Sequence, residues 1–275
     1  MNEYRPGRFQ YLPLVIKNLM IINGLVWLVQ ITLLNRFGYD LSRPLGLHYW
    51  GSELFRPHQF VTHLFLHDPK NITHVLFNMF TLWMFGATLE NLWGPKRFLI
   101  FYLVCGLGAA LCHMGVLTYE NINLTKYAQA FLNDPTYTNF ARLDNKFDIG
   151  SSSSFSMESL KTALQYNNPQ AVDIAVAYVR EYVLEYRNTA TIGASGAVYG
   201  ILFAFGYLFP NAYLYLYFLF PIKAKYVVAF LILAELWSGI QNSAGDNVAH
   251  FAHLGGALFA YLLLRGWTKR RSDFY

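Results

Sequence analysis

Charged side chains are scarce in this 275-residue chain, because only 13% of its residues are charged whereas 55% are hydrophobic. An ordinary soluble domain carries about 25% charged residues, so this composition excludes that class. The net charge of +5 does not predict binding to nucleic acid, because the basic residues fall at the termini and in short connections between apolar segments. The composition predicts an all-α polytopic membrane protein that has the lipid bilayer, and no nucleic acid, as its partner.

Cysteine is also scarce, and the two that are present cannot pair with each other. Cys105 and Cys112 are seven residues apart in one apolar segment. In a helix they would lie about 10 Å apart, which is too far for a disulfide bond. The two cysteines therefore carry no information about the redox compartment.

Patterns that bind metals are absent. His63, His67 and His74 lie near one another in the sequence, but the neighbouring carboxylate, Asp68, falls in a predicted loop. The chain also has no H-E-x-x-H motif of the kind that binds zinc on a helix. We therefore predict no metal site and no cofactor.

Apolar segments are abundant, and six of them are candidates to cross a bilayer core, which requires about 20 residues. The predicted spans are residues 14–34, 72–93, 98–117, 193–209, 226–240 and 248–264. Eleven of the 21 Lys and Arg residues lie at the termini and in alternate connections. Because basic residues stay on the cytoplasmic side, this distribution predicts six spans with both termini inside.

The spans divide the chain into three parts. Residues 1–117 hold the first three spans with an aromatic outer loop at 35–71. Residues 118–190 carry eight of the 16 acidic residues and are predicted to form an extracytoplasmic helical insert between the third and fourth spans. Residues 191–275 hold the last three spans and a basic cytoplasmic tail.

The second half of the insert has the pattern of an amphipathic helix between Pro169 and Arg187. Its apolar face consists of Val172, Ala175, Val179, Val183 and Tyr186. Such a helix packs back on the membrane body or belongs to a subdomain that selects a partner or substrate. The pattern by itself favours the first alternative.

Two polar motifs open apolar segments. Residues 191–200, TIGASGAVYG, place the hydroxyl of Ser195 among glycines, which leave neighbouring N–H groups open to a substrate carbonyl. The same small residues also suit a close helix contact. Residues 247–256, NVAHFAHLGG, place His253 at the start of the last span, so the two motifs supply a nucleophile and a base.

These polar residues lie at one predicted depth. The second, fourth and sixth spans run in the same direction, so their beginnings share the outer level of the membrane. Ser195, His253, His74 and Asn78 all fall near such a beginning. At a rise of 1.5 Å per residue they lie within about 10 Å of the outer boundary, where water reaches them.

Three motifs in this order resemble those of the rhomboid family of intramembrane serine proteases: HVLFN at 74–78, GASGAVYG at 193–200 and AHLGG at 252–256. The resemblance implies a six-transmembrane-helix, rhomboid-like bundle. It also implies a serine endopeptidase whose substrates are transmembrane segments of other proteins, cut near the outer face. We expect its location to be the inner (plasma) membrane of a bacterium.

The resemblance also assigns roles to residues. It implies that Ser195 is the nucleophile and His253 the general base, and that His74 and Asn78 stabilise the oxyanion. Two features depart from the family pattern. Residues 58–59 are His-Gln where many members carry Trp-Arg, which affects how the outer loop is anchored, and the insert at 118–190 is unusually long.

Four other polar residues leave alternatives open. His250, one helical turn before His253, is a rival base, and Asp246 could complete a triad, although a dyad is favoured. Glu90 is expected to hydrogen-bond a neighbouring loop. Glu235 inside the fifth span is costly in a membrane, and it either joins helices within the bundle or belongs to a transport path.

The fifth span is the predicted wall through which a substrate helix enters. It connects the two helices that carry Ser195 and His253, and a Ser, Gly and Asn-rich loop follows it. We expect Leu236 and Trp237 to be among its bulky packing residues, so that truncating either would loosen the wall.

Overall fold

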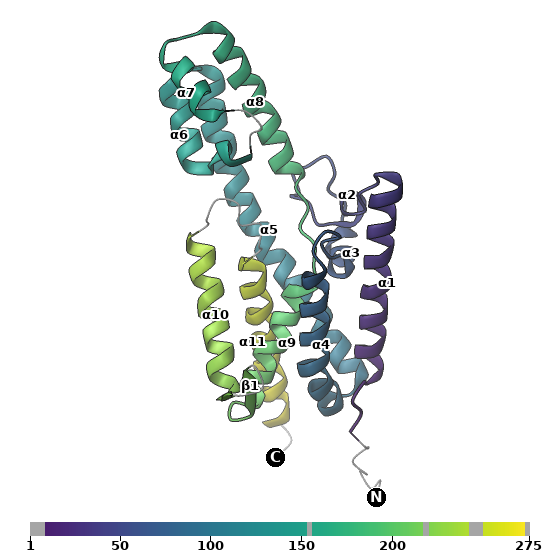
Figure 1. The fold of residues 1–275 in the computed structure, drawn as a ribbon. Coiled ribbons are helices and arrows are strands. Elements are labelled where there is room, and N and C mark those ends of the chain that lie inside the picture. Colours follow the sequence, from purple (N-terminus) through teal and green to yellow (C-terminus); the bar gives the residue numbers. More distant parts are fainter. Residues whose placement is uncertain (1–8, 153–155, 217–219, 242–249, 273–275) are drawn as a thin grey trace, which may run out of the picture.

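We analysed a computed structural model of the chain, which describes residues 9–152, 156–216, 220–241 and 250–272. The protein is almost entirely helical (Figure 1). The long helices are α1 (Leu14–Phe37), α4 (Ile72–Trp93), α5 (Pro95–Asn133), α8 (Pro169–Asn188), α9 (Ser195–Leu208), α10 (Ala224–Gln241) and α11 (His250–Ser272). The short helices are α2 (Ser42–Leu45), α3 (Gln59–Thr62), η1 (His63–Phe65), α6 (Tyr137–Phe147), η2 (Ile149–Ser152) and α7 (Met157–Gln165).

Four helices in the described part of the chain are long and apolar enough to cross a membrane, namely α1, α4, α5 and α10. Helix α9 is apolar but has only 14 residues. The predicted class, an all-α membrane protein, agrees with this finding. The count of six spans stays a prediction, because it depends on α9 and α11 crossing as well.

Helix α5 differs from the predicted third span. It does not end near residue 117 but continues without a break to Asn133. Residues 118–133 are polar in composition, yet they contain no Gly or Pro that would end a helix. The helix stops only where Pro135 restricts the residue before it, so the membrane bundle and the insert share one continuous helix.

Helices α6, α7 and α8 gather around the far end of α5, apart from the other long helices (Figure 1). The predicted amphipathic helix is present as α8, and the side chain of Asn168 caps its N-terminus. Its buried Ala175 and Val179 pack in a second hydrophobic core with Leu124 and Phe131 of α5. The expectation that this helix packs back on the membrane body is therefore wrong, because the extension of α5 provides an apolar partner.

Helix α9 lies at the centre of the main bundle, between α10 on one side and α4 on the other, with α11 and α5 beside it (Figure 1). Its buried residues are mostly small or apolar, and they form the middle of the main core with residues of α4 and α5. A short helix with so little polar surface is stable only when neighbours cover it. The bundle therefore fixes the position of the first residue of α9, Ser195.

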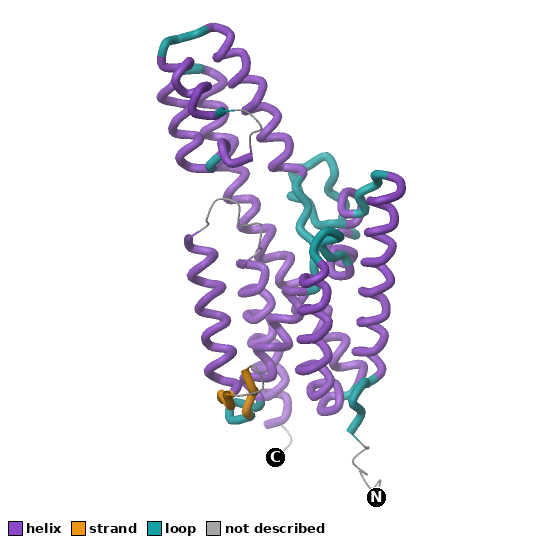
Figure 2. Tube along the Cα trace, viewed as in Figure 1, coloured by secondary structure: helices purple, strands orange, loops and turns teal. Residues whose placement is uncertain are grey.

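The loops and the hairpin lie at opposite ends of the bundle (Figure 2). Strands β1 (Tyr213–Leu216) and β2 (Phe220–Lys223) pair antiparallel between α9 and α10. They lie at the end where α1 begins and α11 ends (Figure 2). The irregular segments around α2 and α3 lie at the other end, near the start of α9.

The buried carboxylate of Glu90 holds the beginning of α1 against α4. The carboxylate of Glu90 accepts 2.9 Å hydrogen bonds from the backbone N–H groups of Val15 and Ile16. It thereby caps α1, whose N-cap Pro13 provides no side-chain hydrogen bond. Glu90 is hydrogen-bonded as predicted, but its partner is the first turn of α1 and not a loop.

Gln59 anchors the outer loop, although the sequence lacks the Trp-Arg pair found at this place in many rhomboid-like sequences. Its side chain is fully buried, and its Oε1 accepts hydrogen bonds from the backbone N–H groups of His48 and Arg56. Its Nε2 donates to the carbonyl of Leu54 at 2.9 Å. One uncharged amide thus ties three parts of the loop together.

Candidate active site

The segment before α9 is held on both sides. Thr191 and Leu47 exchange two backbone hydrogen bonds of 2.8 and 2.9 Å, and the N–H of Gly193 donates to the carbonyl of His63 at 3.0 Å. Gly193 has a φ of 131°, a conformation that strongly favours glycine. The strand-like entry and this turn together deliver Ser195 to the first position of α9.

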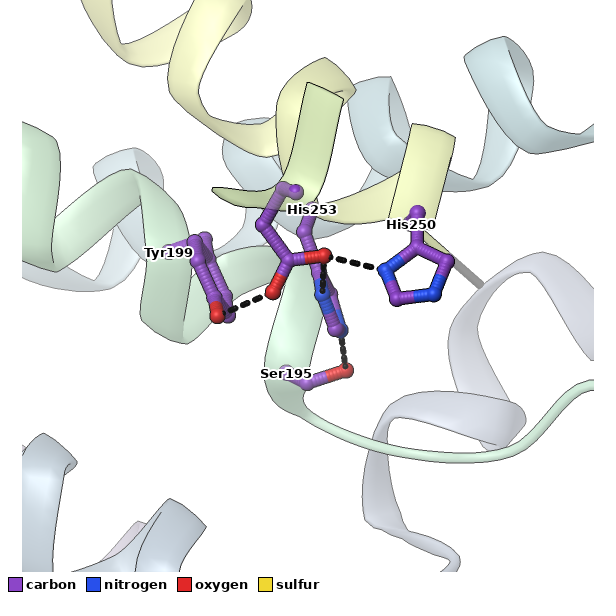
Figure 3. Close-up of polar contacts among 5 residues, drawn as sticks. Ser195, Tyr199, His250 and His253 are labelled. Atoms are coloured by element: carbon purple, nitrogen blue, oxygen red, sulfur yellow. Dashed lines mark hydrogen bonds and ion pairs between the residues drawn. The ribbon is translucent and has the colours of Figure 1, made fainter. Parts of the chain in front are cut away.

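A hydrogen bond of 2.8 Å joins Ser195 Oγ to Nε2 of His253 (Figure 3). The two residues can meet because α9 and α11 touch through their backbones. A Cβ atom added to Gly256 would lie 1.8 Å from the carbonyl oxygen of Gly196, so only glycine fits there. The small residues therefore serve both purposes considered from the sequence, since the close helix contact is what brings serine and histidine together.

The ring of Tyr199 stacks on that of His253, with centroids 4.2 Å apart and planes inclined by 6°. Tyr199 is one helical turn after Ser195, so both project from the same face of α9. It fixes the plane of the imidazole. Tyr199 was not among the residues predicted for the site, although its spacing of four from Ser195 is a signal that both share one helix face.

Glu235 of α10 also reaches His253. Its Oε2 lies 3.0 Å from Nδ1 of His253 and 2.6 Å from Nδ1 of His250, and its Oε1 accepts a hydrogen bond from the hydroxyl of Tyr199 (Figure 3). The carboxylate is 11% exposed. Of the two roles left open for Glu235, a link between helices is the one that matches these contacts.

The same geometry separates the two histidines. His253 Nε2 contacts Ser195, whereas His250 contacts Glu235. His250 is therefore placed beside the carboxylate and His253 between the carboxylate and the serine. Asp246, the residue considered as a third member, lies outside the described residues.

His74 lies at the site, and Asn78 is turned toward its own helix. A Cβ atom added to Gly193 would lie 3.1 Å from Nε2 of His74 and 3.5 Å from Oγ of Ser195, so both groups flank one glycine. The amide of Asn78 is buried and donates to the carbonyl of His74 at 2.8 Å. The oxyanion role of both residues stays a prediction.

Glu235, His250 and His253 offer three atoms that could bind a metal ion, all within 4.8 Å of one another. They are the group of this kind in the described part of the chain, and the three histidines at 63, 67 and 74 do not form one. Each of the three side chains already contacts another member.

The profile of the rhomboid domain matches residues 53–126 and 149–270, which together are more than half of the chain. The chain belongs to the rhomboid family. Two relatives of this rhomboid protein match over most of it. "RHOMBOID-like protein 12, mitochondrial" of Arabidopsis thaliana is 26% identical over 216 residues, 78% of this chain and 47% of its own length. "Uncharacterized rhomboid protein P4H10.10, mitochondrial" of Schizosaccharomyces pombe is 28% identical over 218 residues, 77% of this chain and 52% of its own length.

"Rhomboid protein 1, mitochondrial" of Saccharomyces cerevisiae is 40% identical over 82 residues, which are 28% of this chain and 21% of that protein. The chain spans about half the length of the two relatives that it matches most broadly. No solved structure matches it. All three relatives are mitochondrial by name, so the expected location in a bacterial inner membrane is wrong. Composition could not have revealed this, because both membranes impose the same apolar pattern on a span.

Proposed function

We propose that this rhomboid protein is an intramembrane serine endopeptidase that cuts transmembrane segments of other membrane proteins. The observation that supports it best is the 2.8 Å hydrogen bond between Ser195 Oγ and His253 Nε2. A serine hydroxyl is a weak nucleophile unless a base within hydrogen-bonding distance takes its proton. This contact joins two helices at the level of the first turn of α9, where a substrate carbonyl can approach.

The reaction follows from the positions of the donors and acceptors. Nε2 of His253 takes the hydroxyl proton while Oγ of Ser195 attacks the peptide carbonyl, and the imidazolium then gives that proton to the leaving amine. Water hydrolyses the acyl-enzyme in the reverse order of proton transfers. His253 is thus the base of the first half-reaction and the acid that completes it.

The oxyanion forms beside the N-terminus of α9. The first N–H groups of a helix have no partner within the helix, and they carry the positive end of its dipole. The N–H of Ser195, with His74 and Asn78 as side-chain donors, is the proposed oxyanion hole. Removing one donor of this kind costs about 2.7–4 kcal/mol of transition-state stabilisation in a hydrolase. The Asn78 amide has two N–H groups, so one can donate to the oxyanion while the other stays on the carbonyl of His74.

We propose that α9 and α11 cross the membrane with α1, α4, α5 and α10, which gives six spans. The beginning of α1 and the end of α11 lie at the same end of the bundle, as an even number of spans requires. The insert at 118–190 has a hydrophobic core of its own and would stand outside the bilayer. The names of the relatives favour a mitochondrial membrane.

The alternative is a rhomboid relative that binds membrane helices without cutting them. A single experiment separates the two: the purified protein is placed in liposomes with a labelled single-span reporter protein. We expect the wild type to produce two fragments and Ser195→Ala to produce none, while Ser42→Ala in the outer loop cuts normally. Equal fragments from the wild type and Ser195→Ala would end the protease proposal.

A further inference from the structure

Glu235 is the one acidic residue of α10, a helix whose other polar residues lie in its first turn and near its end. A carboxylate within a membrane helix costs about 3 kcal/mol on insertion scales, so its position needs compensating partners. Its partners come from two other helices: Tyr199 of α9 and both histidines of α11. The polar group of α10 is therefore directed into the candidate active site and not toward lipid.

We propose that Glu235 is a positioning residue that completes a Ser195–His253–Glu235 triad and, because it is carried by α10, makes the activity depend on α10 lying closed against α9 and α11. This inference rests on the proposed protease function and deepens it. The motifs shared with the family imply a dyad, and they contain no residue of α10.

The position of the proton on the His253 ring depends on the group that lies beside Nδ1. For Nε2 to accept the proton of Ser195, the neutral ring must carry its hydrogen on Nδ1, and an acceptor beside Nδ1 favours that tautomer. Among the described residues the carboxylate of Glu235 lies 3.0 Å from Nδ1, within ion-pair distance, and Nδ1 is buried without a hydrogen bond of its own. The carboxylate also stabilises the imidazolium that forms during attack.

The contacts of Glu235 and Tyr199 also orient the imidazole ring of His253. Tyr199 stacks on one face of the His253 ring, and its hydroxyl donates to the other oxygen of the same carboxylate. One carboxylate therefore bridges the ring that moves the proton and the ring that fixes its plane. Nδ1 of His250 also contacts Oε2 of Glu235. This contact holds the carboxylate in place from the outer side.

The packing of α10 differs between its two halves. Its buried residues, Ala224 and Val228, lie in its first two turns. Its outer half exposes large apolar side chains: Leu233, Leu236, Trp237 and Ile240. In the described residues, the contacts of this half with the bundle include those of Glu235 and the close approach of Gly239 to Phe251. Moving α10 aside would break these contacts and leave Nδ1 of His253 without its acceptor.

The coupling has a consequence for the reaction sequence. A substrate helix that enters beside α10 meets a site whose base is not yet oriented, and the chemistry proceeds only after α10 returns. Glu235 cannot contact His253 while α10 is open, so opening of the bundle and proton transfer by His253 cannot occur at the same time. Such an arrangement protects membrane proteins that merely pass the opening.

The test uses two measurements on the 275-residue chain in liposomes containing EDTA, so that no metal ion occupies the cluster of Glu235, His250 and His253. The first is the rate at which a small fluorophosphonate labels Ser195, which requires an activated serine but no entry of a helix. The second is kcat and KM for the labelled single-span reporter. The variants are Glu235→Gln, Glu235→Asp and Tyr199→Phe, with Val228→Ala as the control that loosens α10 without touching the cluster.

We expect Glu235→Gln to slow labelling by about 100-fold or more, since losing the carboxylate of a triad costs up to about 10⁴-fold in known serine proteases. Its kcat should fall in parallel while KM stays constant or decreases, because α10 opens more easily. Glu235→Asp should recover part of the labelling rate, and Tyr199→Phe should show a smaller loss. Val228→Ala should label within about twofold of wild type.

Labelling of Glu235→Gln at the wild-type rate would overturn the triad. An equal loss in Glu235→Gln and Val228→Ala would also overturn it, because a general loosening of α10 would then explain the effect. If Glu235→Gln does not fold, Tyr199→Phe labelling at the wild-type rate would count against the proposal in its place. Cleavage of the reporter by Ser195→Ala would instead refute the protease function itself, whatever Glu235 does.

Discussion

The contact between α9 and α11 and the contact of α10 with both differ in kind. Helices α9 and α11 meet through backbone, with Gly196 and Gly256 so close that no side chain fits between them. Helix α10 is covered much less by its neighbours. In its most apolar stretch of 18 residues 17% of the residues are buried, against 44% in the corresponding stretches of α4 and α5. In the described residues its outer half contacts the others through the carboxylate of Glu235 and through Gly239, which lies close to Phe251.

The difference separates two requirements of the proposed reaction. The distance between a nucleophile and its base must be fixed within a few tenths of an ångström, and a backbone contact without adjustable side chains provides that. Entry of a substrate helix requires a wall that can move, and few buried contacts make local opening easy. The contact between α9 and α11 suits the first requirement and the loosely covered α10 suits the second. Glu235 links α10 to the other two helices.

The largest expected effect removes the base from the rigid contact. His253→Ala should reduce kcat on the reporter by about 10⁴–10⁶-fold, as much as Ser195→Ala does, because members of one catalytic unit are not additive. His250→Ala keeps the Ser195–His253 contact and should retain most of the activity. A dead His250→Ala beside an active His253→Ala would show that the imidazoles are assigned in the wrong order.

The next effect separates α9 from α11 without removing a catalytic group. Gly256→Ala forces a methyl group to within 1.8 Å of the Gly196 carbonyl, and overpacking of this kind costs about 1–3 kcal/mol or more. We expect a lower unfolding temperature in detergent and almost no cleavage. Gly266→Ala, on the same helix with nothing within 4 Å of the added atom, is the matched control and should behave as wild type.

A smaller effect is expected at the inner end of α10. Val228 is buried against Gly206, and truncating it to Ala should cost about 1–2 kcal/mol, which is two methylene-sized groups. Because α10 then opens more readily, kcat/KM for the reporter should stay constant or rise while the unfolding temperature falls. A loss of cleavage with unchanged stability would contradict a role of α10 in entry.

The smallest effect corrects an expectation from the sequence. Trp237 is 66% exposed and Leu236 is 41% exposed, so they are not the packing residues that hold α10 in place. Trp237→Ala should change stability by less than about 0.5 kcal/mol, as exposed sites usually do. A fall of several degrees in the unfolding temperature, measured beside Val228→Ala, would show that Trp237 packs on the bundle after all.

The sequence predicted the helices well where an apolar run has clear start and stop signals. Residues 72–93 coincide with α4 (Ile72–Trp93), because an asparagine cap and a Gly-Pro break mark its ends. The same signals were missing between the third span and the insert, so α5 was predicted to end too early. The packing of α8 could not be read from its own pattern, since an amphipathic face does not state which surface covers it.

For the site, the motifs placed Ser195 and His253 together because each has a short local signature. Glu235 has none: it is one carboxylate in an apolar helix, and its proximity to His253 depends on the tilt of α10, which no local pattern encodes. Tyr199 differs again, since its spacing from Ser195 predicts a shared face but not the stacking on a ring from another helix. Local sequence thus pointed to the proposed reacting pair and to Glu235 as a candidate link between helices, but it did not show that Glu235 and Tyr199 meet His253.

The central claim is that Ser195 is a nucleophile activated by His253. Its most direct test is peptide mapping by mass spectrometry after treating the protein in liposomes with a fluorophosphonate. The account predicts one covalent adduct on Ser195 in the wild type and none above background in His253→Ala. An adduct on another residue, or labelling of Ser195 at the same rate in His253→Ala, would contradict it.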